Sequence, residues 1–119
     1  DHVIIPTQTE PLALHGLKGM CRTSEMIERS RRRALPVSIL PTLHDKRTRT
    51  GAETLKAMQD AHGDAVWNDA IPNDTRICSV EALTHSAPAA QYPGRGLSAY
   101  RRALDWLLLT EARATEQAA

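Results

Sequence analysis

The chain has 119 residues, of which 41% are apolar, and carries 15 Lys and Arg against 14 Asp and Glu. This length and composition predict one small globular domain. A net charge of +1 gives no overall attraction to nucleic acid, so a polyanion site would need local clusters of Arg and Lys. The sequence shows no signal peptide, no apolar run near the roughly 18 residues of a membrane span, and no paired cysteine spacing. We therefore expect a cytoplasmic protein without a membrane partner.

The first elements are a strand and a helix. Residues 2–5 are an apolar run typical of a buried strand, and a strand at this point leads us to expect further sequence upstream. Thr9 or Glu10 can cap a helix with Pro11 in its first turn, where the missing N–H costs nothing. Apolar residues at spacings of three and four then predict a helix to about Arg33.

A second strand and a second helix follow. Residues 35–40 form an apolar, β-branched run that Pro41 is expected to end, because proline lacks a ladder N–H. The pattern over residues 50–63 predicts a helix with Gly63 at its C-terminal cap. Residues 66–71 add a third, short strand or an extended segment ending at Pro72. The order β-α-β-α-β predicts an α/β fold, a parallel sheet with flanking helices.

The remainder is predicted to contain a turn, a loop and a closing helix. Residues 73–76 suit a turn, residues 77–84 one or two helical turns, and residues 87–96 a surface loop. Ser98 is expected to cap a final amphipathic helix, with residues 112–119 frayed at its end.

Two groups of cations stand out. Lys46, Arg47 and Arg49 follow the second strand, and the C-terminal ends of parallel strands are where ligands bind in open α/β sheets. Arg29 and residues 31–33 end the first helix, where cations complement the helix dipole. Contact with DNA is the alternative role for this second group.

Three stretches resemble the ParA/Soj partition ATPases, relatives of MinD with a variant P-loop. They are Leu40-Pro-Thr-Leu-His-Asp-Lys-Arg-Thr-Arg49, Val3 to Leu17, and Ile71-Pro-Asn-Asp-Thr-Arg76 with residues 92–95 and 99–100. The resemblance implies that residues 1–119 are the C-terminal half of a P-loop NTPase domain with three α/β/α layers. The Gly-rich Lys loop and the Asp-containing switch strand of the family are not in this sequence.

The resemblance also implies a nucleotide site. The adenine end of ATP would lie against Thr42, Asp45, Pro72, Asn73 and Asp74, while the Mg²⁺ ligands and catalytic residues would lie outside this chain. The alternative for Pro72 to Asp74 is an ordinary turn, which proline and Asx residues favour. Asn73 replaces the Arg that the family usually has after the proline.

DNA-contacting residues follow from the same resemblance. Basic positions of the family fall on Lys46, Arg47, Arg49, Arg76 and Arg95, and nonspecific DNA binding needs phosphate neutralisation with little base reading. A solvated charged surface is the alternative. Around residues 77–82 the chain is about two residues longer than the family pattern, which weakens the match at Arg95.

The leading hypothesis is a partition protein for a chromosome or plasmid. ATP would close a homodimer that binds DNA without sequence specificity in the nucleoid, and a ParB-like partner would stimulate hydrolysis. This chain alone would lack ATPase activity. The alternative is a degenerate stand-alone module that binds DNA or protein without ATPase activity. A MinD-like membrane role is disfavoured because residues 112–119 lack the basic and bulky apolar pattern of an interfacial anchor.

Overall fold

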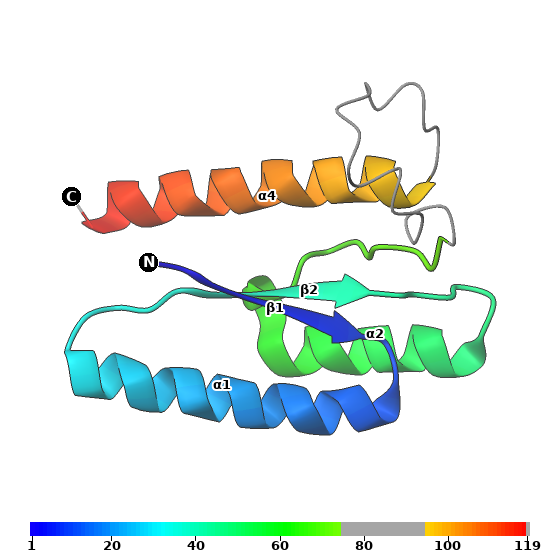
Figure 1. Ribbon diagram of the computed structural model, residues 1–119, viewed down its shortest axis with the longest axis horizontal. Helices are drawn as coiled ribbons and strands as arrows, with labels where there is room; N and C mark the ends of the chain where they lie inside the picture. Colours follow the sequence, from blue (N-terminus) through cyan, green and yellow to red (C-terminus); the bar gives the residue numbers. More distant parts are fainter. Residues whose placement is uncertain (75–94, 119) are drawn as a thin grey trace, which may run out of the picture.

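The computed structural model describes residues 1–74 and 95–118 and shows an α/β arrangement in three layers (Figure 1). In the described part, a two-stranded parallel sheet lies between helices α1 and α2 on one face and helix α4 on the other. The predicted fold class is therefore confirmed. The elements are β1 (Val3–Gln8), α1 (Pro11–Arg31), β2 (Val37–Thr42), α2 (Arg49–His62), the 3₁₀ turn η1 (Gly63–Ala65) and α4 (Arg95–Ala118).

Prolines lie inside both strands without breaking the ladder between them. Val3 N–H donates to the Pro36 carbonyl at 2.9 Å, so every second residue of β1, counted from Val3, bonds toward β2. Pro6 lies between two such residues, at a position where a backbone N–H would point away from β2. On β2, the Pro41 carbonyl accepts from Ile71 N–H at 2.9 Å, on the side away from β1. The prediction that Pro41 ends the strand is wrong, because the missing N–H is not one that this ladder uses.

The expected third strand is an extended segment held by isolated parallel bridges. Val66 bridges Ile39, and Pro72 bridges His44. Trp67 N–H donates to the Ile39 carbonyl at 3.0 Å, which fixes the segment beside β2. This pairing brings the end of the segment to the C-terminal end of β2.

One core lies between the sheet and helices α1 and α2. Its buried members are Ile5, Leu17, Ile39, Met58 and Val66. Met58 is fully buried, and Leu17 is 2% exposed. The helix boundaries follow the predicted signals: Pro11 opens α1 next to Glu10, and Gly63, with φ 54°, ends α2. The predictions of these two helices are confirmed.

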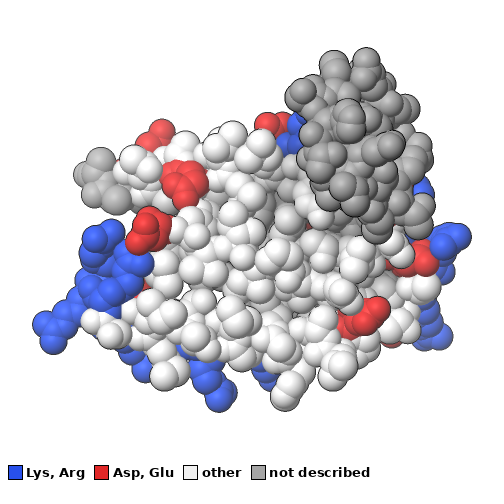
Figure 2. Space-filling model, in the orientation of Figure 1, with Lys and Arg blue, Asp and Glu red and all other residues white. Residues whose placement is uncertain are grey.

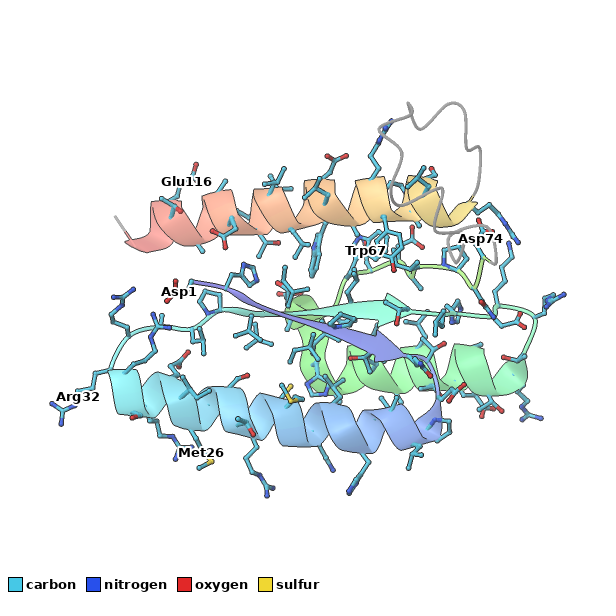
Figure 3. All side chains as sticks on the ribbon, in the orientation of Figure 1. Asp1, Met26, Arg32, Trp67, Asp74 and Glu116 are labelled. Atoms are coloured by element: carbon cyan, nitrogen blue, oxygen red, sulfur yellow. The ribbon has the colours of Figure 1, made fainter. Side chains whose placement is uncertain are left out.

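A second core lies between the sheet and α4. Ala99 and Ala103, four residues apart on one helix face, pack with Leu40, Trp67 and Ile71, and Figure 3 shows Trp67 between α4 and the sheet. The small alanine side chains let the helix approach closely. Tyr100, Leu104 and Leu108, also four apart, form an exposed apolar flank of the same helix.

Both ends of α4 differ from the predictions. The helix begins at Arg95 rather than near Ser98, whose hydroxyl instead accepts from Arg102 Nη1 at 3.1 Å within the helix. Residues 112–118, expected to fray, continue the helix. The helical turns predicted for residues 77–84, the loop before residue 95 and Arg76 lie outside the described residues. Within the described part, no helix is long and apolar enough to cross a membrane.

Candidate functional site

The C-terminal ends of the strands carry two loops that are bonded to each other. His44 N–H donates to the Ile71 carbonyl at 3.0 Å, and Asn73 N–H donates to the His44 carbonyl at 3.1 Å. The loop after β2 and the loop at residues 71–74 are therefore held side by side. This is the edge of a parallel sheet at which α/β proteins bind ligands.

A cavity of about 830 Å³ opens at this edge. It receives residues from the loop after β2, from residues 68–73 and from the start of α4. Its lining includes six of the ten residues predicted for nucleotide or DNA contact: Asp45, Lys46, Arg47, Pro72, Asn73 and Arg95. The structure thus brings together segments that are about 50 residues apart in the sequence.

Asp45 organises the turn that leads into α2. Its carboxylate accepts three hydrogen bonds from Arg47, two at 3.0 Å from the backbone N–H and Nε and one at 3.2 Å from Nη2. Hydrogen bonds from the Arg47 side chain, and then from its backbone, hold the pKa of the Asp45 carboxyl below its ordinary value. The carboxylate that the resemblance assigned to the nucleotide is thus engaged with Arg47.

The next turn depends on a glycine. Thr48 Oγ1 donates to the Asp45 carbonyl at 2.9 Å and accepts from Gly51 N–H at 3.1 Å, which caps α2. A Cβ on Gly51 would lie 2.7 Å from Thr48 Oγ1 and 2.8 Å from the Asp45 carbonyl oxygen. The close approach that positions Lys46 and Arg47 therefore requires glycine at position 51.

The cations of this end fall into two classes. Arg47, Arg49 and Arg102 each pair with a carboxylate of the described chain, namely Asp45 at 3.0 Å, Glu53 at 2.8 Å and Asp69 at 3.2 Å, respectively. Lys46 and Arg95 line the cavity and are exposed, with no ion pair to the described residues. These two side chains are the best placed to meet an anionic ligand.

Three more predicted residues fall in the described part of the chain and do not line the cavity. Thr42 is the half-buried last residue of β2, and Arg49 is on the first turn of α2. The Asp74 carboxylate accepts from Gly96 N–H at 3.2 Å, which places a negative charge at the N-terminus of α4. Figure 3 shows Asp74 at this end of the molecule.

Several cavity residues were not predicted from the sequence. Asn68, Asp69, Ser98 and Arg102 reach the lining through tertiary packing, which no local motif indicates. His44 was assigned no role, yet its Nδ1 lies 3.0 Å from Thr9 Oγ1 and so links the ends of β2 and β1. The separation of 35 residues hides this contact from any local pattern.

The polar side chains of the cavity are suited to hydrogen bonding with a neutral partner. The side chains of Asn68 and Asn73 are exposed at the cavity and offer both amide donors and carbonyl acceptors. The carboxylates of Asp45 and Asp69 are each paired with an arginine, so they are poor Mg²⁺ ligands. The described residues contain no group of three metal-ligating side chains.

Comparison with known proteins gives consistent names. The chromosome-partitioning ATPase Soj of Treponema pallidum is 32% identical over 93 residues, covering 77% of this chain and 36% of the relative. The sporulation initiation inhibitor protein Soj of Bacillus subtilis is 30% identical over 100 residues, covering 83% and 39%. The chromosome partitioning protein ParA of Caulobacter vibrioides is 30% identical over 93 residues, covering 77% and 34%.

This chain is a ParA/Soj-type sequence. The resemblance drawn from its motifs is thereby confirmed at the level of the partition-protein family. The chain spans a little over a third of the length of these relatives. No family model matches the sequence.

Proposed function

We propose that this chain provides the base end of the nucleotide site and part of the DNA-binding surface of an ATP-dependent partition protein. The observation that supports this proposal is the convergence of the loop after β2, the loop at residues 71–74 and Arg95 on one cavity at the C-terminal ends of the strands. Relatives named Soj or ParA, one of them a chromosome-partitioning ATPase, match across more than three quarters of the chain. In this proposal the segment is the C-terminal half of the ATPase domain.

The base end of the nucleotide would be held mainly by side chains. The backbone N–H groups of His44 and Asn73 already donate across the two loops, so they are not available to a base. The exposed side-chain amide of Asn73 can pair with a purine edge, and the ring of Pro72 can pack against the face of the base. The Mg²⁺ ligands and the hydrolytic residues would come from the part of the ATPase domain outside this segment.

The DNA contact would use the cations that have no carboxylate partner in the described chain. Lys46 and Arg95 can neutralise phosphates without first breaking an ion pair, whereas Arg47 and Arg49 would have to leave Asp45 and Glu53. Such contacts hold the duplex without reading its sequence. Arg76 remains a proposed contact from the family resemblance. ATP-dependent homodimerisation, stimulation by a ParB-like partner, and a cytoplasmic, nucleoid-associated location complete the proposal.

The nucleotide role can be tested at Asn73. Isothermal titration of ATP into the full-length protein should show weaker binding for Asn73→Ala, whereas Gln59→Ala, an amide on α2 outside the cavity lining, should bind as the wild type does. Equal affinity for ATP in both variants would contradict a base contact at this loop.

The DNA role can be tested at Lys46 and Arg95. Loss of two phosphate contacts in Lys46→Gln/Arg95→Gln should weaken duplex binding by roughly tenfold or more at physiological salt. The control Lys56→Gln/Arg113→Gln removes the same charge from exposed positions of α2 and α4 outside the cavity lining. If both double variants bind DNA equally well, the cavity end is not the DNA surface.

A further inference from the structure

The end of α1 carries a group of arginines that the cavity does not use. Arg29, Arg32 and Arg33, called here the α1-end arginines, are exposed where α1 ends and the chain turns toward β2. Helix α1 runs antiparallel to the strands, so its C-terminus lies at the N-terminal edge of the sheet (Figure 1). Figure 3 places Arg32 and Asp74 at opposite ends of the long axis of the molecule.

Helix capping does not account for the whole group. Arg29 and Arg31 lie in the last turn of α1, where cations complement the helix dipole, and Arg31 also pairs with Asp1 at 3.3 Å, but Arg32 and Arg33 follow the last helical residue. The α1-end arginines have no ion pair with the described residues. Three exposed cations without an ion pair to the described residues form a local positive patch, which attracts a polyanion.

The backbone at Arg32 supports a role other than folding. Arg32 ends α1 in the left-handed region, with φ 53° and ψ 30°, a position where glycine or asparagine is the usual residue. An arginine here accepts backbone strain that glycine would avoid. The backbone conformation therefore does not by itself select arginine at this position.

The composition of the group favours nucleic acid over a membrane. All of its cations are arginines, whose guanidinium groups match phosphate oxygens with paired hydrogen bonds. Its neighbours Ser30 and Ala34 are small, and no aromatic or leucine side chain stands among residues 29–34 to insert into a bilayer. In Figure 2, blue Lys and Arg atoms gather at this end and, separately, at the opposite end.

We propose that the α1-end arginines are a second DNA-phosphate contact, separate from the cavity end. This inference rests on the proposed DNA binding of the protein and extends it to the opposite end of the molecule. Contacts at both ends would add to the number of counterions released when the protein binds a duplex. The total salt dependence of binding would then exceed what the cavity end alone produces.

The experiment measures the salt dependence of duplex binding by the full-length protein, with ATP and Mg²⁺ present. The α1-end variant is Arg29→Gln/Arg32→Gly/Arg33→Gln, in which glycine relieves the positive φ and protects the fold. The control Lys56→Gln/Arg101→Gln/Arg113→Gln removes the same charge from exposed positions elsewhere. Each phosphate contact makes the slope of log K against log salt concentration steeper by about 0.9. The slope of the α1-end variant should therefore be shallower than that of the control by roughly 2 to 3.

The outcomes separate this inference from the proposed function. Equal slopes for the α1-end variant and its control overturn the inference and leave the cavity proposal standing. A reduced slope in the α1-end variant, with normal binding by Lys46→Gln/Arg95→Gln, supports the inference and contradicts the cavity as the DNA surface. Wild-type binding to phosphatidylglycerol vesicles but not to the duplex would overturn the inference in favour of a lipid partner.

Discussion

The two faces of the sheet are packed differently. On the face covered by α1 and α2, Leu17 and Met58 of these helices are buried in one core. They pack there with Ile5, Ile39 and Val66. On the opposite face, α4 packs on the sheet through Ala99 and Ala103, and it leaves an apolar flank exposed to solvent. Three residues of the cavity lining, Arg95, Ser98 and Arg102, come from α4, so the cavity depends on the position of this helix. We therefore expect the layer of α1 and α2 to dominate stability, whereas small shifts of α4 alter the site.

The largest expected effect is on stability, from the layer of α1 and α2. Met58→Ala would remove a fully buried side chain from the core between these helices and the sheet. The lost packing and the remaining cavity should lower the free energy of unfolding by roughly 2–5 kcal/mol. Urea unfolding followed by circular dichroism measures this change. The control is Leu104→Ala on α4, where the side chain is 54% exposed. If Met58→Ala lowered the free energy of unfolding by less than this control does, the assignment of the main core would be contradicted.

A substitution in the layer of α4 should separate stability from site geometry. Ala103→Leu would insert bulk where α4 meets Trp67 and Ile71, with a cost of about 1–3 kcal/mol. Because the displaced helix carries Arg95 and Arg102, DNA binding should fall more than it does for Met58→Ala at a temperature where both variants remain folded. Duplex binding by fluorescence anisotropy checks this. Unchanged binding in Ala103→Leu would show that the position of α4 does not matter to the site.

Gly51→Ala tests the turn that positions the cavity cations. The added Cβ would meet the Asp45 carbonyl oxygen at 2.8 Å, and backbone cannot move aside as readily as a side chain. We expect a loss of about 1–3 kcal/mol in the free energy of unfolding. Thermal unfolding measures the change, with Ala52→Gly, at the next exposed helix position, as a control for helix propensity. Because Gly51→Ala gains the helix propensity that Ala52→Gly loses, an unchanged or increased free energy of unfolding in Gly51→Ala would mean that this turn tolerates the close approach.

The smallest effect is the pH response of Asp45. Hydrogen bonds from Arg47 hold the pKa of this carboxyl below its ordinary value. At a pH above the ordinary pKa, these hydrogen bonds therefore contribute their full stabilisation to the ordered turn. This contribution is lost as the pH falls through the lowered pKa. An NMR titration of the Asp45 carboxyl should give a midpoint below the ordinary one, and Arg47→Gln should raise it. Identical midpoints in the two proteins would contradict the Asp45–Arg47 contact.

Local patterns were sufficient to predict much of the fold. Pro11 and Gly63 mark the start of α1 and the end of α2, and the apolar runs locate both strands. Pro41 was misinterpreted because its effect depends on which side of the strand its missing N–H faces. That direction is set by strand pairing and cannot be read from the neighbouring residues.

The site was predictable where its residues follow a strand and not where packing assembles it. Asp45, Lys46 and Arg47 follow β2 directly, and Asn73 follows a proline turn, so sequence reasoning located them. The start of α4 was predicted four residues late, because a cap at Ser98 would make residue 99 the first of the helix, which instead begins at Arg95. Asp74, whose carboxylate accepts from Gly96 N–H, lies 22 residues before Gly96 and provides no local capping signal. His44 was missed because its partner, Thr9, lies on another element.

In the proposed function, nucleotide and DNA are bound together at the cavity end of the molecule. The most direct test of this proposal is the affinity of the full-length protein for a fluorescent duplex, measured with ATP, with ADP and without nucleotide. The proposal predicts tight binding only with ATP, and loss of this ATP effect in Asn73→Ala. Equal affinity under all three conditions would contradict it and would favour a DNA-binding module that works without a nucleotide.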